Sequence, residues 1–109
     1  MWSRSVVVAN QITLTANTGD EKQLRMLLNE LVDHALKSKG CHKYELYQFE
    51  DERDRFMIVE IFKSIKAQKK FTEDETVVSI RESIYPLLAS EGTSALKLTR
   101  CLSKQQYWS

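Results

Sequence analysis

The sequence predicts an α+β fold with the element order βαββαβ. Two runs rich in β-branched and aromatic residues, 44–49 and 56–62, flank six consecutive charged residues, a pattern typical of a β-hairpin with a solvated tip. Before and after this hairpin, apolar residues recur at helical spacing, and near each end of the chain a short apolar run indicates a further strand. We therefore expect a hairpin in the middle of the chain, with one helix and one outer strand on each side.

Length and composition limit the class of protein. A chain of 109 residues predicts one domain, residues 1–109, with a core over about 6–102 and a tail over 103–109. Acidic and basic residues are interspersed along the chain and leave a formal net charge of +1, so we expect no nucleic acid and no membrane as partner. The short apolar start is a poor secretory signal, and Cys41 and Cys101 are expected to be reduced thiols, which together favour a cytoplasmic protein.

The first strand and helix are predicted over residues 6–14 and from about 20 to 39. Asn10 interrupts an otherwise apolar strand face, so it needs a hydrogen-bonding partner from the backbone, water or a ligand. Thr18 and Glu21 fit a capping box before the helix, and Gly40 is a natural end to it. Between them the apolar stripe of the helix consists of Leu24, Leu27, Leu28, Leu31 and Ala35.

Both faces of the hairpin are mostly apolar. One face is expected to carry Tyr44 and Leu46 with Phe56, Ile58, Glu60 and Phe62, and the opposite face carries Tyr47, Phe49, Met57, Val59 and Ile61. Such a sheet cannot leave one side in water without exposing a large apolar surface. The helices can cover only one of the two faces.

The second half of the chain predicts a broken helix and a last strand. Ser64 is a plausible N-cap for a short helix, residues 72–76 form a polar break, and Pro86 should end or kink the helix that follows. Residues 95–102 then read as the last strand. The order is that of the ferredoxin-like fold, a four-stranded antiparallel sheet with the first and third strands at its centre.

The uncovered sheet face predicts a homodimer. It would expose Val7 and Ala9 beside the apolar residues of the hairpin, more than a soluble monomer usually tolerates. Symmetric dimers are the commonest way to cover such a face, and a monomer with an apolar ligand face is the alternative.

The residues also resemble a known family. The first-strand run Val-Val-Ala-Asn-Gln-Ile-Thr-Leu, the run Gly-Cys-His-Lys-Tyr-Glu-Leu-Tyr and the run Arg-Phe-Met-Ile-Val-Glu-Ile-Phe-Lys-Ser are similar to the antibiotic biosynthesis monooxygenase domain, over about residues 6–102. The resemblance implies a dimeric α/β barrel with a ligand cavity in each subunit between sheet and helices. It also implies an enzyme that uses no cofactor, because several such monooxygenases let an electron-rich substrate anion react with oxygen itself.

The chain departs from the family at positions that matter for chemistry. Relatives often carry Trp where this chain has Phe62, and a His in the region of Phe71. Haem-degrading relatives combine an Asn at the position of Asn10 with that Trp and an iron-ligating His, near which this chain has Arg81. The missing axial ligand removes the strongest reason to expect haem.

Candidate site residues follow from the helix-facing side of the sheet and from the resemblance. Glu60, in an apolar setting, should have a raised pKa and could act as a base, with Asn10 orienting substrate or oxygen and His34 as a possible proton-transfer group. Each could instead be structural, Glu60 through pairing with Lys or Arg and His34 as a solvated residue at the helix edge. Neither His has partners at metal-ligand spacing, so no metal site is predicted. The expected substrate-binding residues are Tyr44, Phe56, Ile58, Phe62, Phe71, Arg81 and Tyr85.

Three functional hypotheses remain open. The first is a cofactor-independent monooxygenase for a small aromatic or quinol-like compound. The second is a dimer that binds a small ligand without catalysis, and the third is an isomerase of a small phosphorylated metabolite, with Arg81 as its basic group. The element order also occurs in RNA-binding domains, but residues 55–62 lack their basic-glycine-aromatic run, so RNA binding is rejected.

Overall fold

The computed structural model describes the backbone of residues 4–90 and 94–103, and the side chains of residues 7–90. The elements, in chain order, are β1 (Arg4–Thr15), α1 (Glu21–Leu36), β2 (Cys41–Gln48), β3 (Arg55–Phe62), α2 (Ile65–Glu73), α3 (Glu75–Ile84), a 3₁₀ turn (Tyr85–Leu87) and β4 (Ser94–Ser103). This is an α+β fold with the βαββαβ order that the sequence predicts.

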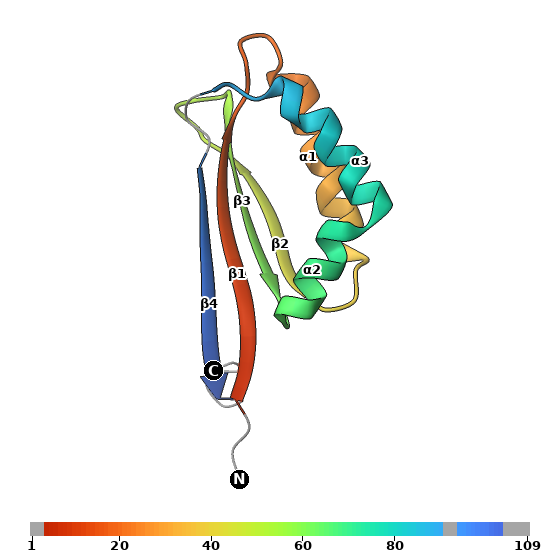
Figure 1. Ribbon diagram of the computed structural model, residues 1–109. Helices are drawn as coiled ribbons and strands as arrows, with labels where there is room; N and C mark the ends of the chain where they lie inside the picture. The colour runs from red at the N-terminus through yellow and green to blue at the C-terminus, as the bar shows by residue number, and fades with distance from the viewer. Residues whose placement is uncertain (1–3, 91–93, 104–109) are drawn as a thin grey trace.

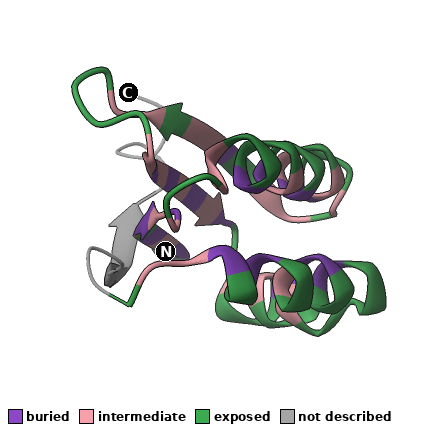
Figure 2. Ribbon diagram, turned by 90° about the horizontal axis from the view of Figure 1, so that it is seen from above, coloured by how far each residue is buried: buried purple, intermediate pink, exposed green. Residues whose placement is uncertain are grey.

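The strands form one antiparallel sheet in the order β2-β3-β1-β4. The helices lie together on one face of this sheet, as Figure 1 shows. Figure 2 looks along the layers and shows that buried residues line the space between the helices and the sheet. The core therefore lies between these two layers.

The register places three polar side chains in one row across the sheet. Asn10 of β1 is the direct partner of Glu60 in β3, and Glu60 is in turn the partner of Tyr44 in β2. Residues that pair directly across neighbouring strands point to the same face, here the face that the helices cover. Strand pairing thus brings together residues that lie 50 positions apart in the sequence.

The helix ends show where local sequence patterns hold and where they do not. The capping box expected at Thr18 and Glu21 is not formed, because the chain turns at Gly19 with φ of 92° and α1 begins at Glu21 itself. Glu21 instead accepts a hydrogen bond from the Gly19 amide, with N and Oε1 3.3 Å apart. Ser64 caps α2 as expected, and its Oγ accepts from the Ala67 amide at 3.0 Å.

The break between α2 and α3 is shorter than the sequence predicts. α2 continues to Glu73, and only Asp74 is extended, with φ of −61° and ψ of 134°. Its carboxylate oxygen Oδ1 accepts hydrogen bonds from the Thr76 and Val77 amides, at 2.9 and 3.1 Å, and so begins α3. Pro86 is the second residue after α3 and lies in the 3₁₀ turn, consistent with its expected role of ending the helix.

The sheet face away from the helices is less exposed than expected. Val7, predicted to lie on the open face, is only 6% exposed. Ala9, Met57, Val59, Ile61 and Phe49 are half-buried, and Tyr47 is the one large apolar side chain of this face that is exposed among the residues whose side chains are described. No helix among the described elements is long and apolar enough to cross a membrane.

Candidate functional site

A cavity of about 340 Å³ lies between the helix-covered face of the sheet and the helices. The sheet supplies its wall on one side, and α1, α2 and α3 supply the other. Most of the lining is apolar, so a ligand of matching size would lose most of its contact with water. The lining residues are Asn10, Ile12, Leu14, Leu28, Leu31, Tyr44, Ile58, Glu60, Gln68, Phe71, Thr72, Arg81, Ile84, Tyr85 and Leu88.

A hydrogen-bonded pair forms the polar part of the sheet wall. Asn10 Nδ2 donates to Glu60 Oε1 at 2.8 Å, and both side chains are buried. The carboxylate gains a donor that compensates part of the cost of its burial, because an ionised group in a dry site is stable only when it is hydrogen-bonded or paired. The hydrogen-bonding partner that the sequence requires for Asn10 is therefore a side chain of the neighbouring strand.

Tyr44 extends this pair to the third strand of the row. The pKa of Tyr44 is raised, chiefly by burial. The negative charge of Glu60 and a hydrogen bond to its carboxylate raise it further, while the charge of Arg81 lowers it. The phenol consequently stays protonated and acts as a hydrogen-bond donor toward Glu60. Asn10 and Tyr44 thus hold one carboxylate from both sides within a single row of the sheet.

Arg81 and Tyr85 form the charged part of the helix wall. They lie one helical turn apart, and Arg81 Nη2 donates to the Tyr85 hydroxyl at 3.0 Å. Arg81 is half-buried and Tyr85 is exposed, so this pair lies where the cavity meets solvent. The cavity thus has a buried acidic wall and a more accessible basic side.

Phe71 joins the cavity to an aromatic cluster behind it. Its ring centroid lies 5.3 Å from that of Phe62 and 5.6 Å from that of Tyr44. Phe62 itself is fully buried and does not line the cavity, and the same holds for Phe56. Both residues were expected to bind substrate. They are core residues near the two ends of β3, and Ile58 and Glu60 between them face the cavity.

The cavity thus brings together most, but not all, of the residues that the sequence singled out. Those that line it are Asn10, Tyr44, Ile58, Glu60, Phe71, Arg81 and Tyr85. It also has two polar lining residues that sequence reasoning missed, Gln68 and Thr72 of α2. Their spacing of four residues places both on one helix face beside Phe71. The sequence pattern did not reveal this, because Thr72 was predicted to lie in the polar break and not in the helix.

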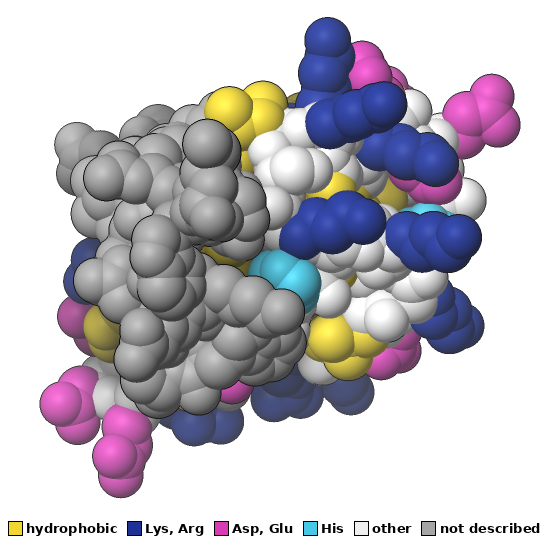
Figure 3. Space-filling model, turned by 90° about the horizontal axis from the view of Figure 1, so that it is seen from below, with side chains coloured by type: hydrophobic (Ala, Val, Ile, Leu, Met, Phe, Trp, Pro, Cys, Tyr) yellow, Lys and Arg dark blue, Asp and Glu magenta, His cyan; other side chains and the backbone are white. Residues whose placement is uncertain are grey.

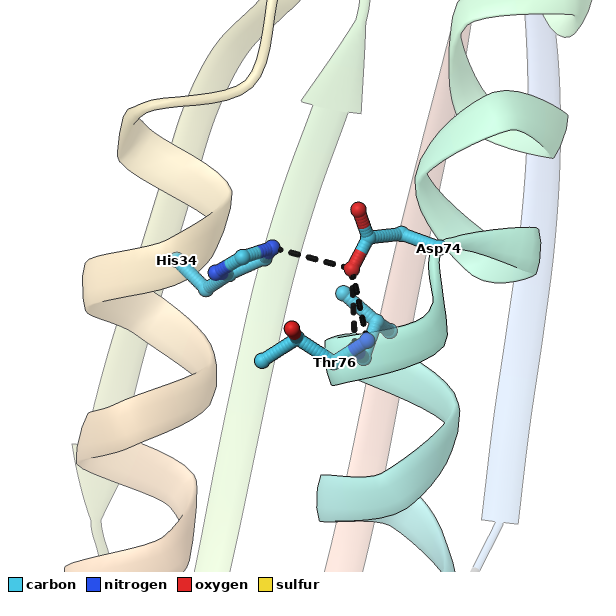
Figure 4. Close-up of polar contacts among 4 residues, drawn as sticks. His34, Asp74 and Thr76 are labelled. Atoms are coloured by element: carbon cyan, nitrogen blue, oxygen red, sulfur yellow. Dashed lines mark hydrogen bonds and ion pairs between the residues drawn. The ribbon is translucent and has the colours of Figure 1, made fainter.

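His34, the expected proton-transfer residue, lies outside the cavity. Its Nε2 is 3.1 Å from Oδ1 of Asp74, the residue that caps α3, as Figure 4 shows. The side chains are 34% and 44% exposed, and the pair joins α1 to the junction of α2 and α3 at the surface. Hydrogen bonds from the α3 amides and the neighbouring His34 lower the pKa of Asp74, so its carboxylate is charged over the usual pH range.

No group of three or more His, Cys, Asp or Glu residues could hold a metal ion within the described part of the chain. Cys41, at the start of β2, is a free thiol whose pKa is raised, chiefly by burial. Cys101 lies among the residues whose side chains are not described.

The sequence profile named antibiotic biosynthesis monooxygenase matches residues 6–83 of the chain. The matched region contains the whole cavity except Ile84, Tyr85 and Leu88. The chain belongs to the antibiotic biosynthesis monooxygenase family. No curated protein matches it.

Solved structures agree with this family in fold. The protein PA3566 from Pseudomonas aeruginosa has a TM-score of 0.79 at 23% identity, covering 88% of this chain and 95% of its own. Rv0793 from Mycobacterium tuberculosis has a TM-score of 0.77 at 21% identity, covering 84% and 92%. A Nitrosomonas europaea protein named as a candidate antibiotic biosynthesis monooxygenase has a TM-score of 0.79 at 12% identity, covering 90% and 93%. At these identities the likeness concerns the fold, and the reaction must be argued from the cavity itself.

Proposed function

We propose that the protein is a monooxygenase that uses no cofactor and oxidises a small aromatic, quinol-like compound. The observation that carries the proposal is a buried carboxylate, Glu60, held by Asn10 in the wall of an apolar cavity. A buried base in an apolar site is what proton removal from a weakly acidic substrate needs. The family membership of the chain agrees with this chemistry.

In the proposed reaction Glu60 accepts a proton from an activated carbon or hydroxyl of the substrate. The resulting anion is electron-rich and reacts with dioxygen directly. The substrate molecule as a whole loses two hydrogens and gains one oxygen atom, and these two hydrogens leave with the second oxygen atom as water. The protein has to bind the substrate, take and return a proton at Glu60, and exclude bulk water.

The other polar residues have positioning roles in this proposal. Asn10 and Tyr44 hold the Glu60 carboxylate in the wall of the cavity, where a bound substrate can reach it. Arg81, on the opposite side of the cavity, favours the anionic form of the substrate by its charge. The apolar residues around them exclude water and strengthen both interactions.

The direct test is oxygen uptake with a panel of hydroquinones and related aromatic compounds. Glu60→Gln keeps the size of the side chain and removes the base, so we expect turnover to fall by about 100-fold or more. Glu30→Gln, an exposed residue of α1, is the matched control and should leave turnover unchanged. Equal oxygen uptake by Glu60→Gln and the unmodified protein would contradict the proposal.

A second candidate function is binding of an anionic ligand without turnover, and a third is isomerisation of a small phosphorylated metabolite. Arg81 favours both, because a guanidinium beside an otherwise apolar cavity suits an anionic ligand. Calorimetry with the same aromatic panel and with sugar phosphates separates the candidates. Tight binding of a compound that neither consumes oxygen nor rearranges would support the second one.

We also propose that the protein works as a homodimer in which the two sheets pack through their helix-free faces. The apolar residues of this face support the arrangement, because Met57, Val59 and Ile61 follow one another along β3, with Ala9 opposite Ile61 and Tyr47 opposite Met57. Sedimentation velocity should report a dimer, and Tyr47→Glu should shift it toward the monomer. A folded monomer at micromolar concentration would contradict the proposal.

A further inference from the structure

Lysines from two separate segments meet at one end of the molecule. Lys37 and Lys39 follow the end of α1, and the others lie at the end of β3 and on α2. We call this the lysine surface, and it consists of Lys37, Lys39, Lys63, Lys66, Lys69 and Lys70. All of these side chains are exposed, and Figure 3 shows Lys and Arg side chains gathered on the end of the molecule seen from below.

Contacts show that the two segments form one continuous surface. Gly40, next to Lys39, packs closely against Lys63 and against Ala67 of α2. A Cβ added to Gly40 would lie 2.7 Å from Cβ of Ala67 and 3.1 Å from Cε of Lys63. The Lys63 amide donates to the Gly40 carbonyl at 2.7 Å. Lys37, Lys39 and Lys70 then border a common surface hollow of about 290 Å³.

The fold brings together two stretches of the sequence that carry lysines and no acidic residue. Residues 34–44 and 62–72, which provide the lysine surface, contain no Asp or Glu. The whole chain has a formal net charge of only +1, so the remainder is net negative. Two acidic residues, Glu73 and Asp74, lie at the edge of the lysine surface. The Asp74 carboxylate already accepts hydrogen bonds from α3 amides and contacts His34.

Two large apolar side chains are exposed beside these lysines. Leu36, in the last turn of α1, is 62% exposed, and Ile65, in the first turn of α2, is 55% exposed. Lysines around exposed aliphatic side chains are the pattern of proteins that lie on a membrane, where the ammonium groups meet phosphates and the aliphatic groups enter the acyl boundary. Single-stranded nucleic acid would instead favour exposed aromatic residues for base stacking, and neither Leu36 nor Ile65 can stack.

We propose that the lysine surface docks on an anionic phospholipid bilayer as a peripheral, reversible contact. The attraction comes from the lysines and falls with added salt, because the Debye length shortens. Leu36 and Ile65 add a contribution that salt does not screen. The proposal does not depend on the reaction in the cavity, since none of the lysines lines it.

The test is flotation of the full chain with two kinds of vesicle, one of phosphatidylcholine alone and one containing phosphatidylglycerol. We expect binding to the anionic vesicles only. The triple variant Lys66→Gln, Lys69→Gln, Lys70→Gln should weaken that binding by about 100-fold, since each lysine near an anionic surface contributes about 1 kcal/mol. Lys22→Gln, Arg25→Gln, Arg53→Gln removes the same charge from exposed residues elsewhere and is the matched control, which should bind almost as well as the unmodified chain.

A second variant tests the apolar part. The double variant Leu36→Ser, Ile65→Ser should still bind anionic vesicles at low salt. At raised salt the unmodified chain should keep some binding to these vesicles, and the double variant should keep none. Three results would overturn the proposal: no binding to anionic vesicles, equal loss in both triple variants, or tighter binding to a single-stranded oligonucleotide than to vesicles at the same salt. Circular dichroism of each variant checks that the fold is kept.

Discussion

Two polar pairs in this protein have nearly the same geometry and opposite surroundings. Asn10 and Glu60 are 2.8 Å apart and are 8% and 5% exposed, whereas His34 and Asp74 are 3.1 Å apart at the surface. The buried pair joins two central strands and lines the cavity, and the surface pair joins two helices and lines none of it. The comparison teaches that burial, rather than the presence of a titratable pair, marks the candidate site.

The energetic consequences of the two pairs should differ accordingly. Water can replace either partner at the surface, so an exposed pair contributes little. A buried carboxylate that loses a donor keeps the cost of its burial without the compensation. Variants of each pair therefore test the contrast directly.

The largest effect is expected for Asn10→Leu, which removes a donor from the buried carboxylate. The free energy of unfolding should fall by about 2–3 kcal/mol, because hydrogen bonds to charged groups are stronger than neutral ones. Urea denaturation measures the change. The triple variant Asn10→Leu, Glu60→Met, Tyr44→Phe replaces the whole polar row and should recover most of the lost free energy of unfolding. If Asn10→Leu alone were as stable as the unmodified protein, the pair would not be structurally important.

Tyr44→Phe should have the next largest effect, about 1–2 kcal/mol, since it removes the second donor to Glu60 and changes little else. Because the pKa of Tyr44 is raised in the folded state, its stabilisation is present below the ordinary tyrosine value of 10.0 and is lost as the pH rises above it. The unmodified protein should therefore lose more stability than Tyr44→Phe between neutral and strongly alkaline pH.

Ser83→Ala is the control for that experiment. The Ser83 hydroxyl donates to the Ser79 carbonyl at 3.2 Å on the exposed side of α3. Its removal should leave the urea midpoint unchanged, because water can take its place. If both variants were equally destabilised, burial would not be the deciding factor.

The sequence predicts the buried part of this comparison well, and for a definite reason. Alternation along β1 and β3 places Asn10 and Glu60 on the same face, because the side-chain period of a strand is fixed at two residues. Whether they face each other depends on the register between strands 50 residues apart, which no local pattern contains. The same alternation leaves open whether Phe56, Phe62 or Ile58 reaches the cavity, since that depends on where the helices pack along β3.

The contacts between side chains on the surface of the helices were harder to predict. His34 lies at the edge of an apolar stripe, and its position alone does not reveal that Asp74, on a different helix junction, is its partner. The lysine surface was missed for the same reason. Lys37 and Lys39 are separated from Lys63 by the whole hairpin, so the chain shows interspersed charge where the fold shows one basic end.

A smaller effect is expected at Asp74, which caps α3. Asp74→Ala should lower the melting temperature by a few degrees, because two amides of α3 lose their acceptor, while Asp74→Asn keeps an oxygen at that place and should lose less. The pKa of Asp74 is lowered, so its contribution is present above the ordinary value of 3.8 and is lost as the pH falls through the folded value. Thermal melts from neutral pH to acid should converge for Asp74→Asn and the unmodified protein.

The smallest effect is expected for His34→Gln, which tests the surface pair from its other side. Gln can still donate a hydrogen bond toward Asp74, and Asp74 keeps the α3 amides as partners, so the melting temperature should barely change. Oxygen uptake should also match that of the unmodified protein at every pH, because His34 lies outside the cavity. A loss of turnover comparable to that of Glu60→Gln, with the fold intact, would restore His34 as the proton-transfer group that its place in the sequence suggested, and would place the reacting centre between α1 and α2 instead of on the sheet.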